Sequence, residues 1–419
     1  MNTMARQKAI RWSGRWPGRF QAVALPVLLL AMPGPGNILR ADDLAPAHAT
    51  APITATARLE YQETRYRVIN WSAAILVQSA PFPKEPASVS GKIVRGLLKF
   101  GDEASNSIPF IWQRDAGKLF LDLNRNQDLT DDAAGMFSAP LSRPLSYQTF
   151  TNVHLRFDTP SGSYPVLADL RFWDYGSRPS CTLDLRSFWQ GQVTLAGQDW
   201  QVGVIPNGWS AAAATDKGYL LLRPWDRRDQ AFNTADGSLE TFAFAQKLFI
   251  GGHPYQVKRV LETRNGEDRP ALEFTEQPVA LGELRITGQY IQRLMLPGGP
   301  YLVILDRPGD TVQVPVGSYN QPNILLAQGG VTAFCNSGPW QTGKRISVDG
   351  KTPAILAAGG PLTNSVAASR HGRDLRLDYR LVGAGDATYE LANANRSQPP
   401  EFAIYKGEKK VASGKFAFG

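Results

Sequence analysis

The sequence predicts a mainly β protein built from tandem β-sandwich or β-hairpin domains. β-branched and aromatic residues recur in short segments typical of strands, at residues 65–69, 74–77, 117–121, 153–157 and 168–172. In the last two segments apolar and polar residues alternate, which places one face of a strand on a core and the other in water. Sustained helical periodicity is scarce after residue 57, and only residues 186–190 indicate a short helix.

Two segments in the middle of the chain resemble each other and predict hairpins of similar build. Residues 193–202 and 248–257 each place a glycine, Gly197 or Gly252, between apolar runs, followed by an aromatic residue and Gln-Val. Glycine supplies the positive φ that tight hairpin turns require. The Asp-Gly pair within residues 347–351 predicts a third hairpin. Duplication of a sheet and convergence on common turn chemistry both account for the similarity.

The chain of 419 residues is long enough for about two to three domains. Residues 42–57 are rich in Ala, Pro and Thr and are interpreted as a linker. We place an N-terminal β domain at residues 58–190, a hairpin-rich middle domain at 191–318 and a C-terminal domain at 319–419.

Residues 1–41 predict a signal peptide that is removed on export. They contain six basic residues and no acidic residue, and an apolar stretch at residues 22–32 follows the basic part. Proline and glycine at residues 33–36 then end any helix. Because a bilayer span takes about 20 residues, no transmembrane segment is expected in the mature chain. A basic tail and a start codon assigned too early are the alternatives.

The charge balance of the predicted mature chain excludes a general attraction to polyanions. The net charge of the whole chain is +8, and removing the six basic residues of the signal peptide leaves +2. A protein of that charge has no overall reason to bind nucleic acid or an anionic membrane. We expect it in the periplasm, the cell envelope or the exterior. There, Cys181 and Cys335 are either bridged or free buried thiols.

The C-terminal domain shows the clearest strand pattern. Residues 375–382 alternate cleanly, and residues 402–405 and 411–418 are expected to pair across a turn at Gly407. The pair Gly385 and Tyr389 resembles the tyrosine corner of immunoglobulin-like domains, in which the tyrosine hydroxyl bonds to nearby backbone. The resemblance implies an immunoglobulin-like β-sandwich and no particular function.

An acidic loop at residues 121–132 carries the most specific chemistry in the sequence. Oxygen-bearing side chains stand at alternate positions and then cluster, in the order Asp122, Asn124, Asn126, Asp128, Thr130, Asp131 and Asp132. Calcium takes six to eight oxygen ligands in a flexible shell. The loop resembles the calcium loops of EF-hand and dockerin proteins, which implies calcium as a ligand and a buried anchor at Leu129.

Two positions depart from the calcium-loop pattern. Gln127 stands where the family has glycine, and Ala133 stands where it has a closing glutamate. Asp131 or Asp132 would have to close the shell instead. The alternative is an Asn/Asp-rich turn that satisfies its own backbone, in which Thr130 caps a short helix. Residues 91–101, the loop and residues 411–419 are together similar to uncharacterised exported β-rich proteins of environmental bacteria, a resemblance that implies no activity.

Other candidate sites are weaker. The four histidines, His48, His154, His253 and His371, fall in loops or on an alternating strand, and no HExxH, GxSxG or CxxC motif occurs. Asp169 with Asp174, or Glu273 with Glu276, would suit glycoside hydrolysis only if the fold made them face each other. Exposed tryptophans, among them Trp173, Trp189, Trp200, Trp209, Trp225 and Trp340, would suit a sugar, whereas core packing is the competing explanation. The basic residues between Arg223 and Arg228 are interpreted as a solvated loop.

These patterns predict an exported, non-enzymatic structural or binding protein of the cell envelope or exterior, stabilised by calcium at residues 122–132. A polysaccharide-binding protein or a polysaccharide-active hydrolase is the alternative. The expected partner is a carbohydrate or an envelope protein.

Overall fold

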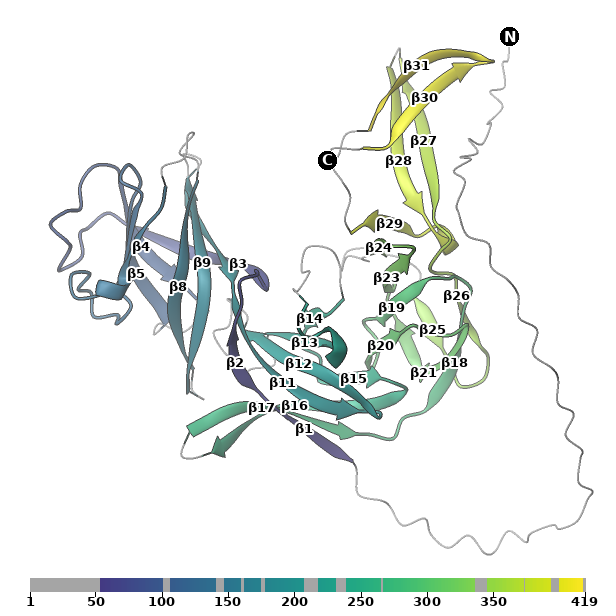
Figure 1. The fold of residues 1–419 in the computed structure, drawn as a ribbon, viewed down its shortest axis with the longest axis horizontal. Coiled ribbons are helices and arrows are strands. Elements are labelled where there is room, and N and C mark those ends of the chain that lie inside the picture. Colours follow the sequence, from purple (N-terminus) through teal and green to yellow (C-terminus); the bar gives the residue numbers. More distant parts are fainter. Residues whose placement is uncertain are drawn as a thin grey trace, which may run out of the picture. The chain divides into compact units, whose positions relative to one another are not determined.

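A computed structural model describes residues 53–100, 106–140, 147–159, 162–174, 178–206, 218–230, 239–264, 267–335, 345–372, 374–392 and 399–416 (Figure 1). The predicted signal peptide and most of the predicted linker lie outside these ranges. The described chain is almost entirely strand, which confirms the mainly β prediction. Its named helical segments are the three-residue 3-10 turns η2 (Ala133–Gly135), η3 (Trp225–Arg227) and η4 (Ala384–Asp386). No helix in the described ranges is long and apolar enough to span a membrane.

The N-terminal part forms an eight-stranded sheet in the order β7-β6-β5-β4-β3-β10-β9-β8. Its strands are β3 (Ile69–Gln78), β4 (Ile93–Lys99), β5 (Ser107–Gln113), β6 (Lys118–Leu121), β7 (Met136–Ser138), β8 (Tyr147–Thr159), β9 (Gly162–Asp174) and β10 (Pro179–Leu185). β3 belongs to both halves of the sheet, since residues 69–73 pair with β10 and residues 74–78 pair with β4. The sheet therefore turns along β3.

The two halves of this sheet pack face to face as a β-sandwich. Phe172 of β9 lies with its ring centroid 5.3 Å from those of both Phe110 and Trp112 of β5. Around these rings the core contains buried aliphatic residues from both halves, including Leu98, Leu119, Leu155, Val166 and Leu183. The alternation in β8 and β9 that the sequence showed is the alternation between this core and solvent.

A second, smaller core covers the outer face of the same sandwich. Ile111 points away from Phe110 and Trp112 because successive side chains of a strand face opposite sides. It is fully buried with Phe120 of β6, under Phe82 and Leu129. The segment that contains Phe82 is held to β4 by Glu85, whose carboxylate accepts two hydrogen bonds of 2.7 Å from Arg95. The acidic loop thus supplies part of the cover of the sheet.

The middle of the chain forms a five-stranded sheet in the order β14-β13-β12-β11-β2. Its strands are β2 (Glu60–Glu63), β11 (Ser187–Leu195), β12 (Gln198–Pro206), β13 (Gly218–Pro224) and β14 (Thr241–Ala243). The first two predicted hairpins are confirmed: β11 joins β12 through Ala196 and Gly197, and β15 (Lys247–Ile250) joins β16 (His253–Arg264) through two glycines, all with positive φ. The predicted helix at residues 186–190 is wrong, because that segment pairs with β2 and β12 as part of β11.

An eleven-stranded sheet runs through the rest of the protein, in the order β1-β17-β16-β15-β20-β19-β23-β24-β29-β28-β27. Its strands not yet given are β1 (Thr54–Arg58), β17 (Glu267–Glu276), β19 (Ile291–Leu296), β20 (Leu302–Asp306), β23 (Asn323–Gln328), β24 (Val331–Cys335), β27 (Thr363–His371), β28 (Asp374–Val382) and β29 (Thr388–Leu391).

The central strands of this long sheet are buried on both faces. In β19, Leu294 and Met295 are consecutive, yet they belong to different cores. Met295 packs in the core that includes Trp200 of β12 and Phe274 of β17, and Leu294 packs in the core that includes Tyr319. Burial on both faces explains why these strands have continuous apolar runs instead of an alternating pattern.

The second of these cores is completed by short strands from the C-terminal half. They are β18 (Leu281–Ile286), β21 (Thr311–Pro315), β22 (Gly317–Tyr319), β25 (Ile346–Val348) and β26 (Ala354–Leu356). The predicted hairpin at residues 347–351 is wrong: β25 pairs with β22, and β26 pairs in parallel with β18. Asp349 nevertheless forms a turn there, accepting hydrogen bonds from the backbone N–H groups of Lys351 (2.8 Å) and Thr352 (2.6 Å).

These pairings divide the chain differently from the predicted domains. β1 covers Thr54–Arg58, within and just beyond the predicted linker, because its residues pair with β17. Glu63 of β2 pairs with Ser187 of β11, so the N-terminal sandwich lies in the sequence between two strands of the middle sheet. The predicted boundary between residues 318 and 319 falls inside the core that contains both Leu284 and Tyr319.

The C-terminal hairpin of β30 (Glu401–Lys406) and β31 (Lys409–Lys415) is confirmed, with Gly407 at positive φ in its turn. Tyr389 is buried, and its hydroxyl accepts a 2.8 Å hydrogen bond from the N–H of Gly359, thirty residues upstream. A tyrosine does bond to backbone at this corner, while the immunoglobulin-like sandwich stays a prediction. Cys181 and Cys335 are free, and they lie in two different hydrophobic clusters.

Candidate functional site

The acidic loop leaves β6 and leads into η2. Its first acidic residue, Asp122, is fully buried, and the carboxylate oxygens of Asp122 accept hydrogen bonds from the backbone N–H groups of Asn126 (3.2 Å) and Gln127 (2.7 Å). Both carboxylate oxygens of Asp122 therefore face into the loop. The arrangement closes the loop into a tight curl around the Asp122 side chain.

Three further side chains fold the loop upon itself in successive turns. The side-chain oxygens of Asn124, Asn126 and Asp128 each accept a hydrogen bond from the backbone N–H two residues later, at 3.0, 2.8 and 3.0 Å. Asn and Asp favour such turns because their short side chains reach the backbone two residues on. The alternate positions that suggested calcium ligands thus also allow each side chain to accept a hydrogen bond from the backbone of the loop itself.

Asp131 brings two of these side chains together. Its carboxylate accepts hydrogen bonds from the side-chain amides of Asn124 (3.2 Å) and Asn126 (2.8 Å). Each amide carries an oxygen opposite the nitrogen that donates. A rotation of either amide would present that oxygen to a cation bound at the Asp131 carboxylate. Of the two residues expected to close the shell, Asp131 is the one that faces the asparagines.

Asp132 adds a third carboxylate at the base of the loop. It accepts a 3.0 Å hydrogen bond from the N–H of Leu123. Burial raises the pKa of Asp132 above its ordinary value, and the charges of Asp122 and Asp131 raise it further. Three carboxylates therefore repel one another within the loop, and this repulsion is what a divalent cation would relieve.

Asp128 and Thr130 lie apart from that group. The carboxylate of Asp128 pairs with Lys84 at 2.6 Å and also accepts hydrogen bonds from the backbone and hydroxyl of Thr130. The Lys84 contact is the main reason that the pKa of Asp128 is lowered to about 2. In EF-hand loops the seventh position binds calcium through its backbone carbonyl, so the side chain of Asp128 is not needed in such a shell.

Two residues of the loop have left-handed backbone, and one of them stands where the calcium-loop pattern has glycine. Gln127, at the position of the family's glycine, has φ of 67°, and Arg125 has φ of 64°. Left-handed conformations are uncommon for residues other than glycine. Leu129 is buried as expected, and its N–H donates a 3.1 Å hydrogen bond to the carbonyl of Lys84. Thr130 does not cap η2, whose N-cap residue is Asp132.

The donor set fits calcium only after local adjustment. No group of three or more His, Cys, Asp or Glu side chains at metal-binding spacing occurs among the described residues. The loop offers carboxylates at Asp122, Asp131 and Asp132 and amide oxygens at Asn124 and Asn126, and all of these are hard oxygen ligands. They would have to exchange their present hydrogen bonds for the ion.

The carboxylate pairs considered for glycoside hydrolysis are not brought together. Asp169 pairs with Arg186 at 3.0 Å and Asp174 pairs with Arg114 at 2.7 Å. Asp169 and Asp174 stand five positions apart on β9, so their side chains leave opposite faces of the strand. Glu276, for its part, contacts His253 at 2.7 Å. Each of these three carboxylates serves an ion pair or hydrogen bond within the fold.

The tryptophans of the described ranges differ in their exposure. Trp112 and Trp200 are buried. Trp189 makes edge contacts with Tyr61 and Tyr164, at 5.6 and 6.1 Å. The guanidinium of Arg228 lies over the ring of Trp225 at 5.1 Å. Trp209 and Trp340 lie outside the described residues, as does His48. Core packing therefore accounts for Trp112 and Trp200, while Trp173, Trp189 and Trp225 are partly exposed.

The interpretation of the basic residues at 223–228 as a solvated loop is wrong for Arg223. This residue is 1% exposed and lies 3.6 Å from Glu240, which is also 1% exposed. Its guanidinium donates to Gln201 (2.6 Å) and to the carbonyl of Gln230 (2.9 Å). The apolar run preceding Arg223 in β13 was the available signal that this arginine is carried into the interior.

Comparisons with known proteins give no further assignment. No family model matches the sequence. No curated protein matches it, and no solved structure matches the fold.

Proposed function

We propose that this chain is an exported, non-enzymatic structural or binding protein of the cell envelope or exterior, and that calcium staples its N-terminal sandwich at residues 122–132. The observation that carries the calcium proposal is the crowding of Asp122, Asp131 and Asp132 in one loop, with Asn124 and Asn126 already turned toward Asp131. These five side chains would hold the ion. Calcium would supply charge neutralisation and no covalent chemistry.

The position of the loop supports a structural role for the ion. Leu129 lies on the outer face of β5 and β6 with Phe82 and Ile111. An ion that orders residues 122–132 would hold Leu129 in this small core. Calcium sites of extracellular modules bind in the range of about 10⁻⁴ to 10⁻³ M, and an affinity of that order suits a loop whose carboxylates are already hydrogen-bonded to backbone.

The test is thermal unfolding of the purified protein in excess calcium and in chelator. An ion that binds only the folded state raises the midpoint with its concentration. Asp122→Ala should abolish the rise, and Asp131→Asn, which keeps the size of the side chain but only one of its two accepting oxygens, should weaken it. Asp310→Ala, an exposed aspartate far from the loop in sequence, is the matched control and should keep it. Identical midpoints for the unaltered protein in both buffers would refute the calcium proposal.

Of the two polysaccharide alternatives, we retain binding. Asp169, Asp174 and Glu276 are each engaged by a basic side chain, and no observation favours their use as acid and nucleophile. A carbohydrate-binding role, in contrast, is supported by a cavity near the C-terminus.

A further inference from the structure

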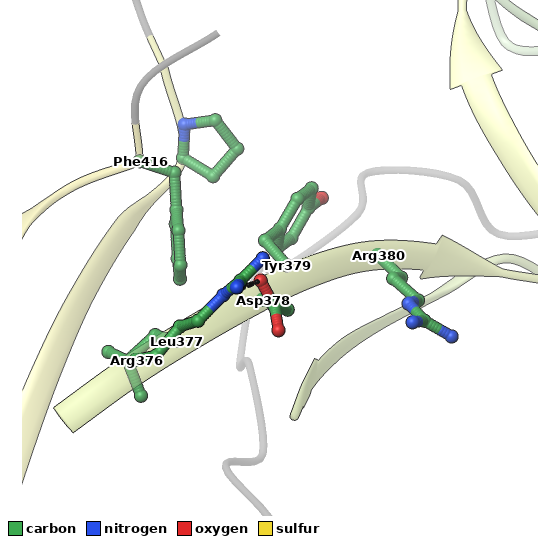
Figure 2. Close-up of a pocket in the computed structure, with 7 residues that line it drawn as sticks. Arg376, Leu377, Asp378, Tyr379, Arg380 and Phe416 are labelled. Atoms are coloured by element: carbon green, nitrogen blue, oxygen red, sulfur yellow. Dashed lines mark hydrogen bonds and ion pairs between the residues drawn. The ribbon is translucent and has the colours of Figure 1, made fainter. Parts of the chain in front are cut away.

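A cavity of about 600 Å³ lies beside β28 (Figure 2). One wall is formed by residues 376–380, and the other by Pro400 and Phe416 at the ends of the β30–β31 hairpin. Ligand pockets in proteins span roughly 300–1,000 Å³. The cavity therefore has room for a small ligand or for part of an oligomeric one.

The cavity lies along β28, one edge of which has no partner at residues 374–380 among the described strands. β27 pairs with β28 over its whole length, whereas β29 pairs only with Leu381 and Val382. Consecutive side chains of a strand leave opposite faces. All five consecutive residues 376–380 line the cavity, through their side chains or backbone, so a ligand there would lie along the strand.

Aromatic rings form the apolar side of the cavity. The ring centroids of Tyr379 and Phe416 are 5.3 Å apart, and Phe402 backs Phe416 at 5.0 Å. The Tyr379 hydroxyl donates a 2.6 Å hydrogen bond to Asn364 on β27. Both rings are thus held by neighbours. Aromatic faces of this kind receive the C–H face of a sugar ring, since they are apolar and carry negative charge density.

The guanidinium groups of Arg376 and Arg380 give the lining of the cavity a net positive charge, since Asp378 is its one acidic residue. Arg376 contacts Asp378 through a single 3.2 Å interaction, so most of its donors remain available. Arg380 is exposed, and its guanidinium group makes no hydrogen bond or ion pair with the described residues, while its backbone belongs to the β27–β28 pair. Figure 2 shows Arg380 further along β28 than the Arg376–Asp378 pair. Guanidinium groups bind carboxylates in a bidentate manner, while a lysine ammonium group acts as a point charge.

The spacing of the arginines indicates an oligomer. At about 3.4 Å per residue, side chains four positions apart on a strand are separated by about 14 Å. That distance exceeds one sugar ring. Asp378, between them, can accept hydrogen bonds from sugar hydroxyls.

We propose that this cavity binds an acidic oligosaccharide, with the carboxylate of a uronic-acid unit on Arg380 and a neighbouring ring against Phe416 and Tyr379. The inference names a ligand class for the binding role proposed above and rests on that role, but it does not require calcium. A free strand edge would also suit an added peptide strand. The paired aromatic rings and the two arginines that line this cavity favour the saccharide.

The experiment is a calorimetric titration of the purified protein with oligogalacturonate and, separately, with a neutral glucose oligomer of equal length. Arg380→Gln should weaken oligogalacturonate binding about tenfold or more, the loss expected for one charge-assisted contact. Arg370→Gln, an exposed arginine on the neighbouring strand outside the cavity, is the matched control and should bind like the unaltered protein. Phe416→Ala should weaken binding as well, with unfolding midpoints recorded for all variants.

Equal affinities for the acidic and neutral oligomers, or equal losses in Arg380→Gln and Arg370→Gln, would overturn the proposal. So would an absence of oligogalacturonate binding, or hydrogen-exchange protection at residues 374–380 by an extended peptide and not by the sugar. Titrations in calcium and in chelator separate the two proposals. If the sugar binds but calcium does not change the unfolding midpoint, only the calcium proposal is refuted.

Discussion

The ammonium group of Lys84 lies 2.6 Å from a carboxylate oxygen of Asp128, and the backbones of the same two residues form an isolated parallel bridge. The segment before β4 and the acidic loop are thus joined at one point by both side chain and main chain. The ammonium group of Lys84 thus pairs with a carboxylate that the proposed calcium shell does not use.

Lys84→Met should raise the pKa of Asp128 from about 2 toward its ordinary value, because the main cause of the lowering is the contact with Lys84. A carboxyl whose pKa is lowered by folding adds stability above its unfolded pKa, and that stability is lost as pH falls through the folded pKa. The variant should therefore lose less stability than the unaltered protein as pH falls from about 4 to about 2. Carboxyl-carbon NMR titration measures the pKa directly, and an unchanged Asp128 pKa in the variant would contradict the assignment.

Asp132→Asn should act in opposite directions with and without calcium. Burial and nearby charges raise the pKa of Asp132 on folding, so its contribution to stability falls as pH rises from the unfolded pKa through the folded one. Asparagine removes the charge and keeps an acceptor for the N–H of Leu123. In chelator at neutral pH, the variant should melt at the same temperature or higher. In calcium the variant should melt at a lower temperature than the unaltered protein. A higher melting temperature in both calcium and chelator would argue against Asp132 as a calcium ligand.

Leu129→Ala should lower the free energy of unfolding by about 2–3 kcal/mol, the lower part of the range for truncating a buried leucine, because the small outer core can partly collapse. Leu129 is 4% exposed, whereas the matched control Leu281 is 39% exposed. Leu281→Ala should cost less than about 1 kcal/mol. Urea unfolding of both variants makes the comparison. Equal costs would show that the loop does not cover the sheet in solution.

Glu240→Ala should lower the free energy of unfolding by about 3–5 kcal/mol, since it leaves the buried guanidinium of Arg223 without its counter-charge. Burial already lowers the pKa of Arg223, and Glu240 opposes that effect. Arg227→Ala removes the more exposed partner of Glu240, at 2.7 Å, and should cost about 1 kcal/mol or less. A similar small loss for both variants in denaturant unfolding would mean that water reaches the pair.

Local patterns predicted the strands that have one face in water. The alternating residues of β8, β9 and β28 and the turns at Gly197, Gly252 and Gly407 gave correct elements, because each signal lies within a few neighbouring residues. The Asp-Gly turn at residue 349 misled, since long-range partners on β18 and β22 decide where β25 and β26 pair.

Burial and domain membership could not be predicted in the same way. Leu294 and Met295 face two cores, and a continuous apolar run does not reveal that. β1 and β2 pair with strands far along the chain, so no local feature assigns them to the middle sheets. At the candidate site, the alternating oxygen side chains predicted a tight loop, and the resemblance to calcium loops predicted that Leu129 is buried. It did not reveal that Lys84 holds Asp128 aside, because that contact joins segments 44 residues apart.

The pairing of the first two strands has a consequence for the order of events during synthesis. Thr54 of β1 contacts Thr275 of β17, which lies 221 positions later in the sequence. Likewise, β2 cannot pair until β11 has been synthesised. Among the described residues, the strands of the sandwich at residues 69–185 pair only with one another, so it can form while the ribosome is still translating the remainder. Long-range strand pairings are slow because the chain must close large loops first. Nascent chains should therefore pass through a stage in which β1 and β2 have unsatisfied edges, and it is at this stage that chaperones or self-association would act.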